Sequence, residues 1–192
     1  MRTDLPENSS PATARKSAPT REQLRDAPQL RESVTVRCTP LEAYAIWRDF
    51  KKLPNFMTDI SQVEMISPTV SHWTVDLPRG PKVEWDAEII HERPGEMISW
   101  QSIGDSQVTQ AGSVRFRPAP GDRGTVVSLA LSYAIPGGKL VEVATKLMGE
   151  DPKTMVITNL RRFKAYMETG ECPTVEGQPS GRDENDRESE TH

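Results

Sequence analysis

The sequence has few cysteines, few histidines and no long apolar run. Its 192 residues include two cysteines and three histidines, so neither a disulfide framework nor a clustered His or Cys metal site is expected. No stretch approaches about 18 consecutive apolar residues, which argues against a transmembrane helix, and residues 1–20 lack the apolar core of a secretory signal. These absences predict a cytoplasmic protein that needs no metal, disulfide or cofactor.

A basic excess is also missing. The chain carries 24 Lys and Arg against 28 Asp and Glu, for a net charge of -4. Residues 171–192 supply this acidity, with seven acids and two arginines, whereas residues 31–170 hold 17 bases and 17 acids. A neutral central region without a basic stripe predicts no nucleic-acid partner.

Apolar residues are scarce at both ends and concentrated in the middle. Residues 31–170 contain all four Trp, all three Tyr and all four Phe, while residues 1–30 and 171–192 contain only eight and two apolar residues. Segments with so little to bury do not offset the entropy of ordering. We therefore predict a disordered tail over 1–30, one folded domain over 31–170 and an acidic disordered tail over 171–192.

The start of the domain predicts a strand followed by two short helices. Alternating apolar residues over Glu32–Cys38 indicate the strand. Thr39–Glu42 reads Thr-Pro-Leu-Glu, the pattern of a capping box with Pro at the first helical position. Apolar residues then recur at helical spacing from Ala43 to Phe50, and a second short helix is expected around Leu53–Asp59.

The remainder predicts six strands and a terminal helix. Period-two alternation and turn residues place the strands at Gln62–Ile66, Val70–Leu77, Lys82–His91, Met97–Ile103, Val108–Pro118 and Thr125–Ala134. A short amphipathic segment at Leu140–Leu147 precedes the final helix, which ends near Thr169. Short connections make neighbouring strands antiparallel, and only the final helix is long enough to cover the sheet. The fold class is therefore α+β.

Several segments carry a family resemblance, which spans about residues 30–170. They are Glu32–Val34, Thr39–Tyr44, Trp47, Phe50, Glu84–Ile89, Pro94–Trp100 and Gly112–Phe116. Together with the element order they resemble the START-like helix-grip superfamily (SRPBCC), in particular its bacterial polyketide cyclase/dehydrase and coenzyme Q-binding-protein-like branch. The resemblance implies a curved seven-stranded antiparallel sheet wrapped around the C-terminal helix, with an apolar ligand held in a cavity between them.

Alternation along the strands and the helix stripe indicate which side chains face such a cavity. The expected ligand-binding residues are Trp73, Trp85, Trp100, Gln110, Phe116, Leu131, Tyr133, Leu160 and Phe163. Most are apolar or aromatic, which suits a ligand held by buried area. The Gln110 amide and the Tyr133 hydroxyl are the two polar candidates for orienting a ligand oxygen.

No catalytic residue is predicted. Glu84, Asp86 and Glu88 alternate with Trp85 and therefore lie on the outer, solvated face. Arg115 and Arg117 project outward from another strand and are expected to neutralise them across the sheet. Carboxylates in water lack the tuned pKa of a general acid.

These observations lead to one function and two alternatives. We expect binding of a hydrophobic small molecule, such as a lipid, an isoprenoid quinone or a polyketide-like compound, by a carrier or chaperone. The first alternative is an enzyme, an aromatic polyketide cyclase/dehydratase, because the resemblance includes enzymes that act mainly by shaping a reactive chain. The second is a domain that contacts a membrane transiently or binds a protein through Leu53–Met57 and Leu140–Met148. The sequence leaves the oligomeric state open.

Overall fold

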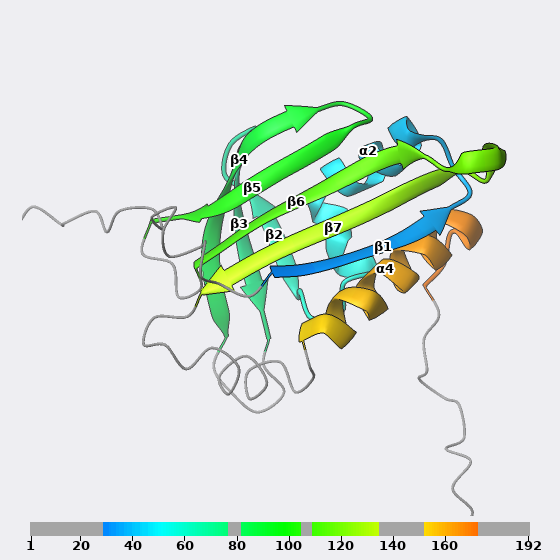
Figure 1. Ribbon diagram of the computed structural model, residues 1–192. Helices are drawn as coiled ribbons and strands as arrows, with labels where there is room; N and C mark the ends of the chain where they lie inside the picture. The colour runs from blue at the N-terminus through cyan, green and yellow to red at the C-terminus, as the bar shows by residue number, and fades with distance from the viewer. Residues whose placement is uncertain (1–28, 77–81, 105–108, 135–151, 173–192) are drawn as a thin grey trace, which may run out of the picture.

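The structure, a computed structural model, describes residues 29–76, 82–104, 109–134 and 152–172, without the side chains of residues 133, 134 and 152 (Figure 1). The chain order is β1 (Gln29–Val36), α2 (Pro40–Arg48), η1 (Phe50–Asn55), β2 (Gln62–Met65), β3 (Val70–Val75), β4 (Val83–Arg93), β5 (Met97–Ile103), β6 (Thr109–Pro118), η2 (Pro120–Asp122), β7 (Thr125–Ala134) and α4 (Pro152–Thr169). The expected helical segment Leu140–Leu147 lies outside the described residues. The division into two tails and one domain stays a prediction.

The seven strands form one antiparallel sheet in the order β1-β7-β6-β5-β4-β3-β2. Consecutive strands from β2 to β7 pair with one another, and β1 pairs with β7, so β1 and β2 are the two edge strands. In Figure 1 the sheet curves over α2 and η1, and α4 runs along β1. The α+β helix-grip fold expected from the sequence is confirmed.

The predicted capping box is present at the start of α2. Thr39 is the N-cap and accepts a hydrogen bond from the Glu42 backbone N–H at 3.2 Å, while Glu42 accepts one from the Thr39 backbone N–H at 2.7 Å. The second helix differs from its prediction, since η1 is a 3-10 turn that begins at Phe50, with only Asp49 between it and the end of α2. Pro54 lies within it, and because proline donates no backbone hydrogen bond, the turn does not extend as an α-helix.

An aromatic cluster joins α2, η1, the sheet and α4. The Trp47 ring lies 5.1 Å from Phe163 and 6.5 Å from Phe116, and Phe56 lies 5.1 Å from Phe163, measured between ring centroids. All four side chains are almost fully buried. Large rings at these separations contribute both buried area and edge-to-face contacts, so this cluster holds the helices against the sheet.

The outer face of the sheet is polar, as alternation predicted, but its charges pair differently. Asp86 pairs with His72 on β3 at 2.7 Å. The expectation that Arg115 and Arg117 neutralise the β4 acids is wrong, because β5 lies between β4 and β6. A bulge after Ile89 also interrupts the expected alternation of β4, so that two successive residues, Ile90 (51% exposed) and His91, are both exposed.

Within the described part of the chain, no helix has the length and hydropathy to cross a membrane. The apolar side chains of Leu53, Phe56 and Met57 are buried in the core. They pack inside the molecule because η1 turns its apolar side toward the sheet and α4, so this segment does not offer them to a membrane or a partner. The other expected contact segment, Leu140–Met148, lies outside the described residues.

Candidate functional site

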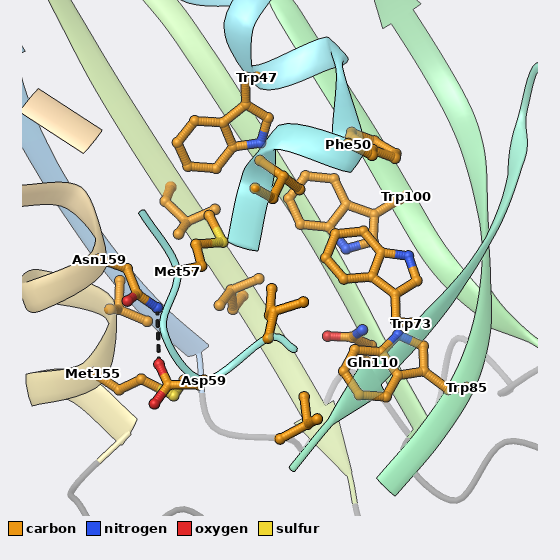
Figure 2. A pocket seen from close by; sticks show the side chains of 16 residues that line it. Trp47, Phe50, Met57, Asp59, Trp73, Trp85, Trp100, Gln110, Met155 and Asn159 are labelled. Carbon is orange, nitrogen blue, oxygen red and sulfur yellow. Dashed lines mark hydrogen bonds between the residues drawn. The ribbon is translucent and has the colours of Figure 1, made fainter. Parts of the chain in front are cut away.

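A cavity of about 110 Å³ lies between the inner face of the sheet, the η1 region and α4 (Figure 2). Of its 16 lining residues, 13 are apolar or tryptophan, and three carry a carboxylate or amide. The lining is Trp47, Phe50, Leu53, Met57, Asp59, Ile60, Trp73, Val75, Trp85, Trp100, Gln110, Leu129, Leu131, Met155, Val156 and Asn159. All four tryptophans of the chain are among them. We refer to this space as the cavity.

Stacked indoles form one wall of the cavity. Trp73 and Trp85 are direct cross-strand partners on β3 and β4, and their rings stack at 6.0 Å with an interplanar angle of 12°. Phe50 of η1 lies 5.5 Å from Trp73. The Trp73 Nε1–H donates to Ser71 Oγ at 2.8 Å, whereas the buried Trp85 Nε1–H has no hydrogen-bond partner within residues 29–76, 82–104, 109–134 and 152–172.

A glycine shapes the adjoining wall. Gly112 on β6 lies between Trp100 on β5 and Leu131 on β7 in one cross-strand row. A Cβ atom at Gly112 would lie 2.6 Å from Trp100 Cε2 and 2.8 Å from Leu131 Cδ2, well inside normal contact distance. The absence of a side chain at Gly112 therefore lets the Trp100 ring lie flat against the sheet beside the cavity.

The opposite side of the cavity is more polar. Met155, Val156 and Asn159 reach it from α4, and Asp59 reaches it from the loop between η1 and β2. Asn159 Nδ2 donates to Asp59 Oδ2 at 3.2 Å, shown as the dashed line in Figure 2. Asn159 is only 7% exposed, and in the part of the chain that the structure describes its Oδ1 has no hydrogen-bond partner.

Gln110 supplies the third polar group, near the start of β6. Its backbone is fixed by Ser102, whose Oγ accepts from the Gln110 N–H at 2.9 Å and donates to the Gln110 carbonyl at 3.3 Å. In Figure 2 the amide lies next to Trp73 and Trp85. A polar group held there by the backbone is suited to orienting a ligand in an otherwise apolar space.

The expected site residues fall into three groups. Trp73, Trp85, Trp100, Gln110 and Leu131 line the cavity. Three more are buried behind it without lining it: Phe116, Leu160 and Phe163. The ninth, Tyr133, belongs to β7, but its side chain lies outside the described part of the structure.

Sequence reasoning missed Asp59 and Asn159. Asn159 follows Val156 by three residues and precedes Phe163 by four, so helical spacing alone puts it on the apolar stripe of α4. That signal was present in the pattern. Asp59 lies in an irregular loop, where no periodicity indicates the direction of a side chain, and nothing in the sequence pointed to it.

The largest pKa shift among the described groups lies outside the cavity. Burial, reinforced by the hydrogen bond to Glu92, raises the pKa of Tyr44 to about 12. Glu92 also pairs with Arg48 Nε at 2.6 Å, and Arg48 donates to the Pro68 carbonyl at 2.8 Å. This network ties α2 to β4 and to the turn before β3.

The described residues contain no group of three His, Cys, Asp or Glu side chains arranged to hold a metal ion. The carboxylate of the cavity, Asp59, has an amide as its partner and no neighbouring histidine among the lining residues. The arrangement can bind and orient an apolar molecule, and it offers hydrogen-bonding atoms at two places.

Comparisons with known proteins agree with this geometry. The family model described as "Polyketide cyclase / dehydrase and lipid transport" matches residues 36–161. An uncharacterized 17.2 kDa protein from the melC2-rnhH intergenic region of Streptomyces lincolnensis is 31% identical over 140 residues, covering 73% of this chain and 89% of that protein. The crystal structure of DR_A0006 from Deinococcus radiodurans is 35% identical with a TM-score of 0.62, covering 74% of this chain and 98% of that one.

A more distant structure supports the fold. A START superfamily protein from Mycobacterium smegmatis has a TM-score of 0.58 at 16% identity and covers 73% of this chain and 97% of its own. The family model confirms the polyketide cyclase/dehydrase resemblance, and the START superfamily structure shows that the fold is shared. The coenzyme Q branch is not singled out by these relatives. With two thirds of its residues matched by the family model, the chain belongs to the polyketide cyclase/dehydrase and lipid transport family.

Proposed function

We propose that this protein binds a hydrophobic small molecule in the cavity and acts as its carrier or chaperone. The observation that carries the proposal is the lining itself, in which 13 of 16 residues are apolar or tryptophan. The family description, which includes lipid transport, supports the same function. A cytoplasmic location, expected from the sequence, remains part of the proposal.

The volume of the cavity limits the size of the group that can bind in it. An apolar cavity of about 150 Å³ in another protein stays dry and binds benzene, so a volume of about 110 Å³ favours a ring-sized group. We propose that Trp73, Trp85, Trp100, Gln110 and Leu131 contact that group. Phe116, Leu160 and Phe163 support these walls from behind, and contact between the ligand and Tyr133 stays a prediction.

The alternative is an aromatic polyketide cyclase or dehydratase, which the family description also includes. Such an enzyme would use the cavity to fold a reactive chain, with Gln110 orienting a carbonyl. The two functions differ in what a Gln110→Leu variant does. A carrier loses affinity in proportion to the lost contact, whereas an enzyme keeps its ligand and loses turnover.

Native mass spectrometry tests the carrier proposal. The purified protein, incubated with an organic-solvent extract of bacterial cells that contains quinones and other aromatic compounds as well as lipids, is expected to carry an apolar adduct that organic solvent releases. A Leu131→Trp variant fills the cavity and should lose the adduct, while Ile90→Trp, on the exposed outer face, should retain it. An adduct of equal occupancy on the Leu131→Trp variant, or no adduct on the unmodified protein, would contradict the proposal.

A further inference from the structure

We propose that the ligand carries a hydrogen-bond donor, a hydroxyl or a protonated amine, on an otherwise apolar planar body, and that this donor binds Asp59 and Asn159. The inference rests on the proposed function and names the chemical class of the ligand. It follows from the uneven distribution of polar atoms around the cavity.

The hydrogen-bond acceptors of Asp59 and Asn159 lie together at one end of the cavity. Figure 2 shows Asp59 and Asn159 together beside α4, across the cavity from Trp73 and Trp85. The two groups are linked by one hydrogen bond, from Asn159 Nδ2 to Asp59 Oδ2. A molecule spanning the cavity therefore has stacked indoles at one end and oxygen acceptors at the other.

Both side chains can accept more hydrogen bonds than they do within the described residues. A carboxylate accepts about four hydrogen bonds, and within the described residues Asp59 accepts one, from Asn159, and forms no ion pair. Asn159 is buried to more than nine tenths, and its Oδ1 has no hydrogen-bond partner among the described residues. A buried acceptor without a donor is unfavourable, so a ligand that brings a donor to this end of the cavity relieves a deficit of the protein alone.

The rest of the cavity lining favours a ligand whose apolar part is a planar ring. The remaining lining presents flat aromatic surfaces from Trp73, Trp85 and Trp100, which favour a planar ring over a flexible chain. A hydroxyl or ammonium group fixed to such a ring would reach Asp59 while the ring stacks against the indoles.

The test compares three probes that share a naphthalene ring. 2-Naphthol carries a hydroxyl, 2-(aminomethyl)naphthalene carries an ammonium group, and 2-methylnaphthalene carries neither. Equilibrium dialysis of the full chain gives a dissociation constant for each. The quantity of interest is the preference for each donor probe over 2-methylnaphthalene, because the ring contributes equally to all three.

Replacing Asp59 should reduce that preference. In Asp59→Leu the preference for at least one donor probe is expected to fall about tenfold or more, since hydrogen bonds to charged groups are among the stronger ones. The control Asp76→Leu removes the same charge at an exposed position, where Asp76 faces Lys82 at 3.6 Å, and should leave the preference unchanged. Asp59→Asn removes the charge but keeps the shape of the side chain, so it provides the same comparison if the Asp59→Leu variant does not fold.

The probes also separate the two donors. If the ligand group is an ammonium, Asp59→Asn weakens the amine more than the naphthol; if it is a hydroxyl, the naphthol remains the preferred probe. Binding of all three probes with the same preference in every variant would overturn the inference and leave the proposed function standing. Failure of all three to bind the unmodified protein would overturn the proposed function itself.

Discussion

Gly112 determines how closely two cavity side chains approach the sheet. In Gly112→Ala the new methyl group would overlap the Trp100 indole and the Leu131 side chain. Indoles are rigid, so the ring must move into the cavity, and overpacking of this kind costs about 1–3 kcal/mol. Urea unfolding should show that loss for Gly112→Ala. The neighbouring Ser113→Ala, on the other face of β6, should change stability little; equal effects of the two would contradict this role of Gly112.

Tyr44 gives a pH-dependent prediction. Burial and Glu92 raise its pKa from 10.0 to about 12 in the folded protein. Between these values the unfolded state binds fewer protons than the folded state, so the free energy of unfolding falls as pH rises. The stabilisation that comes from the raised pKa of Tyr44 is fully present below pH 10 and is lost as pH rises toward 12. Tyr44→Phe should flatten this part of the stability profile, measured by urea unfolding from pH 10 to 12, whereas a profile that keeps its slope in the variant would exclude Tyr44 as the cause.

At the same scale, Asn159 and Asp59 mark the limit of what the sequence could predict. Helical spacing places Asn159 on the apolar stripe of α4, but the pattern cannot say that its amide meets a loop 100 residues earlier in the chain. The inward positions of Trp73, Trp85 and Trp100 were predictable because side chains alternate along a strand with a period of two. Loop side chains such as Asp59 follow no period, and only the folded chain shows their direction.

Among the helices and strands, features set by short-range sequence patterns were predictable, and features set by contacts between distant segments were not. The capping box of α2 and the ends of β5, β7 and α4 agree with the prediction because they depend on short-range patterns. The bulge in β4 was not anticipated, and the expected pairing of Arg115 and Arg117 with the β4 acids overlooked that consecutive hairpins place β5 between β4 and β6. Strand order and register depend on which edges meet, and that information is spread over the whole sheet.

The capping box yields a prediction for α2. Thr39→Ala removes the side-chain acceptor for the Glu42 N–H and leaves that donor to water, which typically costs about 1 kcal/mol. Thr39→Ser retains an acceptor and should lose much less. Chemical denaturation of both variants checks the difference, and indistinguishable midpoints would show that the cap contributes nothing measurable.

At the scale of the molecule, the helices and the sheet enclose the cavity without filling it. Close packing is the norm in protein interiors, yet the largest aromatic cluster, around Trp47 and Phe163, lies to one side of the cavity. The sequence predicted which residues face inward but not where a space would remain, because a few side-chain rotamers decide between a cavity and a packed core. The family resemblance, and not the residue pattern, carried that expectation.

The most direct test of the central claim is a titration with the apolar dye N-phenyl-1-naphthylamine, followed by its own fluorescence. The account predicts saturable binding at one site by the unmodified protein and by Ile90→Trp, whose new ring lies outside. Leu131→Trp fills the cavity and should weaken binding about tenfold or more, provided that circular dichroism shows a folded protein. Equal affinity for all three proteins would contradict the claim that the cavity is the binding site.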